Sequence, residues 1–298
     1  MNVLRTPESR FNHLPDYPFQ PHYLKVGDGL RMHYVDEGAK GAQVVLMVHG
    51  EPSWSFLYRH MIPICADAGQ RVIAPDLIGF GKSDKPARIQ DYSYQSHMDW
   101  MKQFIDTLAL GDITLVCQDW GGLIGLRLAA EQPDRFARIV VGNSMLPTGE
   151  LSVPIAFRLW KAFAVLSPWF PTGRIVEMGC DKTLSREERR AYDAPFPSSA
   201  YAAGARAFPR LVPVTYDMPG AAENRAAWKA LGKWDKPFLT AFSSGDPITR
   251  GGDQCMHRHI PGTRGHKHLT LRGGHFLQED SGPEFAEAVN RFIEDNPL

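Results

Sequence analysis

Residues 115–122 read Leu-Val-Cys-Gln-Asp-Trp-Gly-Gly, and they join an apolar, β-favouring run that begins at residue 113 to a helix-like segment over 123–130. A strand, a sharp turn and a helix with one reactive side chain at the corner are typical of a nucleophile elbow. The corner residue is Asp119, where elbows usually carry serine. A carboxylate is suited to displacing a leaving group from saturated carbon and holding the product as an ester, whereas a serine attacks acyl carbons. The other interpretation of Asp119 is an acidic helix N-cap.

Length and composition place the chain among ordinary globular proteins. Its 298 residues, 43% hydrophobic and 22% charged, suit one large domain or a domain with an insertion. The formal net charge is zero, so no basic surface argues for nucleic acid or an anionic membrane as a partner. No apolar run approaches the ~20 residues of a membrane span, and residues 1–20 lack the continuous apolar stretch of a signal peptide. Four cysteines without pairing or metal-ligand spacing favour a reduced, cytoplasmic compartment.

The segments around the elbow alternate between strand-like and helix-like patterns. Strands are expected at 23–26, 30–35, 43–48, 71–75, 113–117, 138–141, 237–242 and 268–271, and helices at 53–68, 94–108, 123–130 and 283–294. This alternation predicts an α/β fold with a mostly parallel central sheet flanked by helices. Between about 145 and 228 the strand-like runs nearly vanish, while proline, alanine and aromatic residues multiply. We therefore expect a core domain of residues 1–145 and 229–298, with residues 146–228 inserted as a helical cap domain.

Three candidate catalytic side chains follow three separate strands. Asp119 follows the elbow strand, Asp246 follows the strand at 237–242, and His275 follows the strand at 268–271. Because ligand sites in open α/β sheets gather at the carboxyl ends of strands, the three side chains are expected to converge. Their order along the chain, nucleophile, acid and histidine, is that of the α/β-hydrolase triad. His275 is then the base, and Asp246 fixes its tautomer and stabilises the imidazolium.

Each of these residues also has a plainer interpretation. His275 could be a surface-loop histidine, and Asp246 could serve only the turn before Pro247. Asp253 is a spare candidate for the triad acid, and Glu279 could be an acidic partner of His275 or a helix-start acid.

A second turn supplies a candidate oxyanion hole. His49-Gly50-Glu51-Pro52 follows the apolar strand at 43–48, and a tight turn there can aim the backbone N–H of Glu51 into the site. Together with the backbone N–H of Trp120, it would stabilise an oxyanion. The alternative is a simple connection between a strand and a helix.

With these residues assembled, the chain resembles enzymes of the α/β-hydrolase fold, and most of all the haloalkane dehalogenases. The resemblance extends over nearly the whole length and is carried by residues 10–23, 49–54, 79–86, 118–122 and 273–276. In that family the tryptophan after the nucleophile donates its indole N–H to the departing halide, which implies this role for Trp120. Some members take a second halide donor from an asparagine at the position of Glu51, but an ionised glutamate cannot donate.

The resemblance therefore implies the subfamily with an Asp-His-Asp triad and a second halide-binding tryptophan in the cap. Trp160 is the favoured candidate because Ala156, Phe157, Phe163 and Ala164 share its face at helical spacing. Trp169 follows Pro168 and is the reserve.

The implied reaction is hydrolysis of a haloalkane to an alcohol, halide and a proton, through a covalent alkyl ester on Asp119. It needs no metal and no organic cofactor, and the implied partners are a small apolar halogenated substrate, water and halide. We expect no nucleic-acid or membrane partner, and a monomer or a small homo-oligomer. The alternative is an epoxide hydrolase with the same triad, for which Tyr192, Tyr201 and Tyr216 are candidate acids. A catalytically silent binding protein of this fold would usually lose a triad member, and an ester hydrolase would carry serine in place of Asp119.

Overall fold

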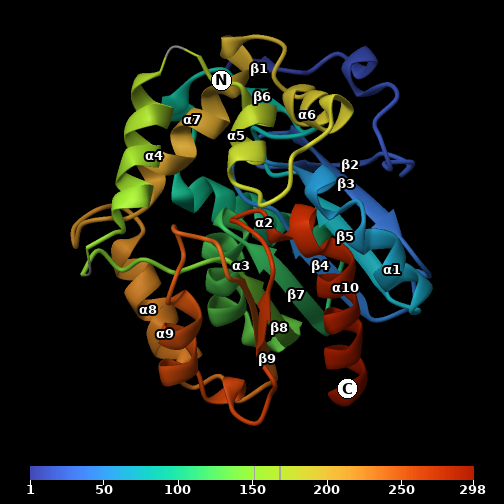
Figure 1. Cartoon of the computed structure of the whole chain (residues 1–298), viewed down its shortest axis with the longest axis vertical. Coiled ribbons are helices and arrows are strands. Elements are labelled where there is room, and N and C mark those ends of the chain that lie inside the picture. Colours follow the sequence, from blue (N-terminus) through green and yellow to red (C-terminus); the bar gives the residue numbers. More distant parts are fainter. Residues whose placement is uncertain (151, 168) are drawn as a thin grey trace.

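The computed structural model describes residues 1–150, 152–167 and 169–298 of the chain. Its described residues build a central eight-stranded sheet in the order β10-β9-β8-β7-β4-β5-β3-β2 (Figure 1). The strands are β2 (His22–Val26), β3 (Leu30–Glu37), β4 (Val44–Val48), β5 (Arg71–Pro75), β7 (Ile113–Gln118), β8 (Phe136–Gly142), β9 (Phe238–Ser243) and β10 (Leu269–Leu271). The pairs from β5 across to β10 are parallel, whereas β3 pairs antiparallel with both β5 and β2. The expected α/β fold with a mostly parallel sheet is confirmed.

The central strands are buried on both faces, as their continuous apolar sequences predict. Every residue of β4 and β7 is buried. Side chains of neighbouring strand residues point to opposite faces, so Leu115 and Cys117 enter one apolar core and Val116 enters the other. Two further short strands, β1 (Val3–Leu4) and β6 (Lys85–Pro86), form a separate antiparallel pair.

Helices cover both faces of the sheet. The helix α1 (Met61–Asp67) packs against α10 (Leu277–Asp295) on one face. On the other face, α3 (Trp120–Glu131) packs against α2 (Tyr94–Thr107) and α8 (Ala221–Leu231). The remaining helices of the core are α9 (Gly252–His259) and the short 3₁₀ segments η1 (Glu8–Phe11), η2 (Ser55–Tyr58), η3 (Ile89–Asp91), η4 (Pro133–Arg135) and η6 (Pro261–Thr263).

Two predicted helices differ from those observed. The helix expected over 53–68 is divided into η2 and α1, and Arg59 and His60 lie between them. The last helix begins at Leu277 rather than Pro283, but Ser281 within it has non-helical backbone angles. Proline is tolerated in the first turn of a helix and not in its interior, so the segment that begins near Pro283 is a helix of its own, as the sequence predicts.

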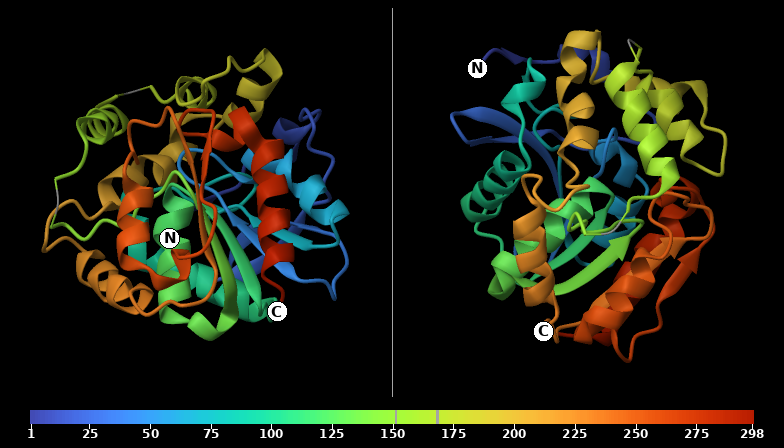
Figure 2. Two further views of the ribbon diagram at one scale, coloured as in Figure 1. Left: turned by 60° about the horizontal axis from the view of Figure 1, so that its bottom comes forward. Right: turned by 90° about the vertical axis from the view of Figure 1, so that its left-hand side faces the viewer.

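Between β8 and β9 the described residues form helices and no strand. They are α4 (Ile155–Leu166), α5 (Thr172–Met178), α6 (Arg186–Asp193), η5 (Ser199–Ala202), α7 (Ala203–Leu211) and α8. Figure 2 shows α4 to α7 gathered at one end of the molecule, with the C-terminus at the other end. Because α8 continues past residue 228 and packs on α3, the domain boundaries at 146 and 228 stay predictions.

No helix within the described part of the chain combines the length and the apolar character that crossing a membrane requires.

Candidate active site

Asp119 lies at the corner between β7 and α3, in a backbone conformation with φ 50° and ψ −124°. Its side chain makes no capping hydrogen bond to α3, which removes the N-cap interpretation of this residue. The sharp turn requires close backbone approach, because a Cβ at Gly121 would collide with the carbonyl oxygen of Val48. The corner therefore exposes the carboxylate at the carboxyl end of the sheet. A side chain in such a strained turn is typical of a nucleophile elbow.

The structure brings the three candidate triad residues together. His275 Nδ1 lies 3.0 Å from Asp246 Oδ2, and His275 Nε2 lies 3.5 Å from Asp119 Oδ2. Asp246 also accepts hydrogen bonds from the backbone N–H of Ile248 at 2.8 Å and from the hydroxyl of Thr249. His275 thus lies between Asp246 and Asp119, and the three side chains meet as their positions at three strand ends predict.

The two carboxylates of this cluster change the pKa of His275. Burial lowers the pKa of His275, but the carboxylates of Asp246 and Asp119 outweigh burial and raise it to about 10. For Asp246, burial acts to raise the pKa, while the charge of His275 and the hydrogen bonds from His275 and Thr249 lower it to about 2. Asp246 is therefore ionised at neutral pH and stabilises positive charge on His275.

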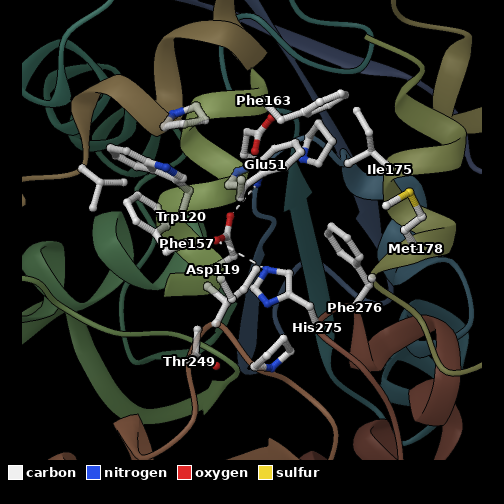
Figure 3. A pocket seen from close by; sticks show the side chains of 18 of the residues that line it. Glu51, Asp119, Trp120, Phe157, Phe163, Ile175, Met178, Thr249, His275 and Phe276 are labelled. Atoms are coloured by element: carbon white, nitrogen blue, oxygen red, sulfur yellow. Dashed lines mark hydrogen bonds and ion pairs between the residues drawn. The ribbon is translucent and has the colours of Figure 1, made fainter. Parts of the chain in front are cut away.

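The turn after β4 contributes the expected backbone donor. The N–H of Glu51 donates to Asp119 Oδ1 at 2.7 Å, and the turn is closed by the N–H of Ser53 bonding to the carbonyl of Gly50 at 3.0 Å. Figure 3 shows Asp119 between Glu51 and His275, with an interaction on each side. The second expected donor, the backbone N–H of Trp120, belongs to the first residue of α3, and its role stays a prediction.

The side chain of Glu51 differs from the ionised group assumed from the sequence. It is 4% exposed, and its Oε1 has no hydrogen-bond partner among the described residues. Burial first, and then the charge of Asp119, raise the pKa of Glu51 well above its usual range, while the charge of His275 and the neighbouring indole of Trp160 act in the opposite direction. A carboxyl group in these surroundings favours its neutral form, which can donate a hydrogen bond.

A mostly apolar cavity of about 650 Å³ opens above Asp119, between the core and the predicted cap. Its charged or titratable lining residues are Glu51, Asp119, Arg174 and His275, and the apolar ones include Leu123, Phe157, Ile175 and Phe276. The volume suits a small apolar molecule.

Three tryptophans line this cavity. Trp120 is buried, and its ring is held by Tyr94 at 5.1 Å and by Phe208 of α7 at 4.4 Å between ring centroids. Trp160 of α4 also lines the cavity, where its side chain lies close enough to Glu51 to affect the pKa of that carboxyl group. Trp169 is 65% exposed. Pro168, which precedes it, lies outside the described residues.

The remaining sequence candidates lie elsewhere. Glu279 is buried in a charge cluster with Arg59 and Tyr192, and Asp253 is in the first turn of α9. Tyr216 is 55% exposed. Among the described residues, the cavity lining includes no tyrosine, which disfavours the epoxide hydrolase alternative, because its candidate acids are tyrosines.

Two contacts of the site were absent from the sequence interpretation. Thr249 holds Asp246, and its position three residues after an aspartate in an Asp-Pro turn is a usable signal for such a bond. Gln118 contacts His275 through its side-chain amide, and nothing in the local pattern indicates that contact. Within the described residues, no three His, Cys, Asp or Glu side chains gather in a way that could hold a metal ion.

Comparison with known proteins agrees with this geometry. Residues 43–172 match the family described as the alpha/beta hydrolase fold. The chain is 56% identical to a haloalkane dehalogenase of Psychrobacter cryohalolentis over the full length of both proteins. It is 55% identical to one of Mycolicibacterium paratuberculosis over 97% of each chain. The tetrameric structure of a haloalkane dehalogenase from Paraglaciecola agarilytica superposes with a TM-score of 0.90 at 37% identity, covering 97% of both chains. This chain therefore belongs to the haloalkane dehalogenases of the α/β-hydrolase fold.

Proposed function

We propose that the protein hydrolyses small apolar haloalkanes to an alcohol, halide and a proton, with Asp119 as the nucleophile. One observation carries the proposal above the others: the carboxylate of Asp119 has no capping role and lies at the floor of an apolar cavity, 3.5 Å from His275 Nε2. A carboxylate in that position can attack a saturated carbon held in the cavity. An Asp119 oxygen forms a bond to the carbon while the carbon–halogen bond breaks, and the halide leaves with the bonding electrons.

Negative charge develops on the halide during this step, so donors pointing at it accelerate the reaction. We assign this role to the indole N–H groups of Trp120 and Trp160. Trp120 is supported by its buried position beside the nucleophile, where Tyr94 and Phe208 hold its ring. Trp160 is supported over Trp169 because it lines the cavity near Glu51, the residue that bonds to Asp119, whereas most of the Trp169 side chain is exposed.

Hydrolysis of the ester then needs a base. His275 takes a proton from water, the water oxygen attacks the ester carbon of Asp119, and the backbone donors of Glu51 and Trp120 stabilise the oxyanion. Forming the ester removes the negative charge of Asp119, which is one of the causes that raise the pKa of His275. Alkylation of Asp119 thus lowers the pKa of His275 and makes it available as a base for the second step.

The cap, the cellular location and the oligomeric state of the protein follow from the same proposal. We infer that residues 146–228 act as the cap over the cavity, which α4 and α5 help to line. The four cysteines are free thiols, which supports a cytoplasmic location. The relative from Paraglaciecola agarilytica is a tetramer, and we expect a small homo-oligomer or a monomer for this chain.

The test combines halide release with mass spectrometry. The purified protein should release bromide or chloride from short haloalkanes and leave styrene oxide unchanged. A His275→Ala variant should release one equivalent of halide and retain an alkyl group on Asp119, because displacement needs no base but hydrolysis does. A folded variant that shows no mass increase with a bromoalkane contradicts the proposed mechanism.

A further inference from the structure

The residue immediately before the nucleophile, Gln118, is fully buried and contacts His275 twice. Its amide nitrogen lies 3.1 Å from the imidazole Nε2 and 3.1 Å from the backbone carbonyl oxygen of His275. A carbonyl oxygen can only accept hydrogen bonds, so the atom of Gln118 that faces it must be the NH₂ group. The opposite orientation of the amide would bring two oxygen atoms into contact. The backbone of His275 therefore fixes the orientation of the Gln118 amide.

This orientation fixes the ring of His275 as well. The same NH₂ group is a donor toward imidazole Nε2, so Nε2 must be the acceptor and the ring proton lies on Nδ1. There it faces Asp246 Oδ2 at 3.0 Å. A proton on Nε2 would instead point at an N–H of Gln118. The contact thus favours the neutral tautomer with a free lone pair on Nε2, which is the form that a base requires.

The amide keeps this orientation at a cost. Gln118 Oε1 is enclosed and has no hydrogen-bond partner among the described residues. A buried carbonyl oxygen without a partner carries a desolvation penalty, and such exceptions in folded proteins call for a functional or structural reason. The two contacts to His275 are the reason that the described residues offer.

We propose that Gln118 is a positioning residue that keeps His275 Nε2 unprotonated, ready to accept a proton from the water that attacks the Asp119 ester. The inference rests on the function proposed above. The charged or titratable groups that face His275 are Asp119 after β7, Asp246 after β9 and Glu51 after β4, and Arg174 of α5 lines the same cavity. While Asp119 is ionised, the two aspartates favour protonation of His275 and oppose Gln118. After alkylation the ester carries no charge. The Gln118 amide then opposes protonation of His275, and Asp246 is the remaining aspartate that favours it.

The kinetic test separates the two chemical steps in wild type, Gln118→Leu and Gln118→Glu. Rapid-quench measurements with bromobutane give the bromide burst, which reports alkylation, and the subsequent ester hydrolysis as a function of pH. Hydrolysis requires neutral His275, so its rate falls as the pH drops through the pKa of this residue. Leucine removes the donor that stabilises the neutral ring and should move this acid limb up by about half to one pH unit. The carboxylate of glutamate stabilises the imidazolium and should move it up by about 1–3 pH units.

Cys117→Ser is the matched control, since Cys117 is the neighbouring buried residue of β7 and lies outside the catalytic machinery. It should leave the acid limb in place. A purely structural role of Gln118 would lower the rate at every pH without moving the limb, and that result in both variants overturns the inference. An absent bromide burst in wild type would instead contradict the proposed function.

A second measurement does not depend on turnover, and its first part leaves Gln118 unchanged. In Asp119→Asn an uncharged amide replaces the carboxylate, as the ester does during the reaction. Imidazole ¹⁵N shifts of His275 in this variant should show a proton on Nδ1 and none on Nε2 at pH 7. Adding Gln118→Glu should extend the doubly protonated form to higher pH. A ring protonated on Nε2 in Asp119→Asn would overturn the inference.

Discussion

Glu51 provides two functions from one residue. Its backbone N–H bonds to Asp119 Oδ1, while its side chain is buried beside the same carboxylate. A second negative charge at this place would repel both the nucleophile and the departing halide. The raised pKa of Glu51 favours the neutral carboxyl group, which adds no charge to the cavity.

Glu51→Gln is therefore expected to retain activity at pH 7 within about threefold, because the amide imitates the neutral acid. The pKa of Glu51 is raised in the folded protein, so its contribution to stability is present below its usual value of 4.5 and is lost as the pH rises toward the folded value. The variant should consequently gain stability over wild type at pH 8 relative to pH 4. Halide-release rates and urea midpoints at the two pH values measure both effects. A large loss of activity at pH 7 would show that the ionised carboxylate is needed.

The hydroxyl of Thr249 donates a hydrogen bond to Asp246, and we expect this bond to support the second chemical step. Thr249→Val keeps the shape of the side chain and removes its hydrogen bond to Asp246, while the backbone N–H of Ile248 and that of Thr249 still hold the carboxylate. Losing one hydrogen bond to a charged group costs about 1.5–3 kcal/mol, so ester hydrolysis should slow by roughly tenfold or more. The bromide burst should stay unchanged, because alkylation does not use His275. Equal loss in both steps would contradict a role through the triad.

The cavity depends on helices that come from distant parts of the chain. α3 carries Trp120 at its first residue, α7 places Phe208 against that indole, and α4 supplies Trp160. Which of Trp160 and Trp169 donates to the halide therefore depends on how α4 and the segment after it are placed over the cavity.

Paired substitutions test this choice. Trp160→Phe keeps an aromatic ring and removes the N–H, so it should lower kcat/KM for bromoalkanes by about ten- to a hundredfold, the value of one hydrogen bond to a charged group. Trp169→Phe is the matched control and should change it by less than about threefold, because an exposed side chain contributes little. Weaker quenching of tryptophan fluorescence by bromide in Trp160→Phe provides an independent measurement. The reverse ranking of the two variants would assign the role to Trp169.

A buried charge cluster connects the predicted cap to the core. Arg59 donates to Glu279 of α10 at 2.9 Å and to Glu188 of α6 at 2.8 Å. Tyr192 of α6 also donates to Glu279, and Lys182 lies 3.0 Å from the same carboxylate. The cluster fixes α6 over the helix that follows His275.

Glu279→Gln is expected to destabilise the protein by about 3–5 kcal/mol, because it leaves the buried Arg59 with less compensating charge. Glu188→Gln is the control and should cost about 1 kcal/mol, since Glu188 is partly exposed. The pKa of Glu279 is lowered by Arg59 against the effect of burial, so its stabilisation is present above the usual value of 4.5 and is lost as the pH falls. Urea unfolding at pH 7 and pH 4 should show the difference between wild type and Glu279→Gln shrinking at the lower pH. An unchanged difference would contradict this linkage.

The fold, and the meeting of the three candidate triad side chains, could be predicted from the sequence. Short, mostly apolar runs rich in β-branched residues, such as 44–48 and 113–117, favour strands buried on both faces, and residues that follow parallel strands gather at one edge of the sheet. The proximity of Asp119, Asp246 and His275 was predictable for that reason. Three features depend on contacts between distant segments and follow only from the folded structure: the contact of the Gln118 amide with His275, the burial of the Glu51 carboxyl group, and the position of Trp160 in the cavity lining. Side-chain orientation and the local dielectric depend on packing between distant segments, and no local pattern in the chain encodes them.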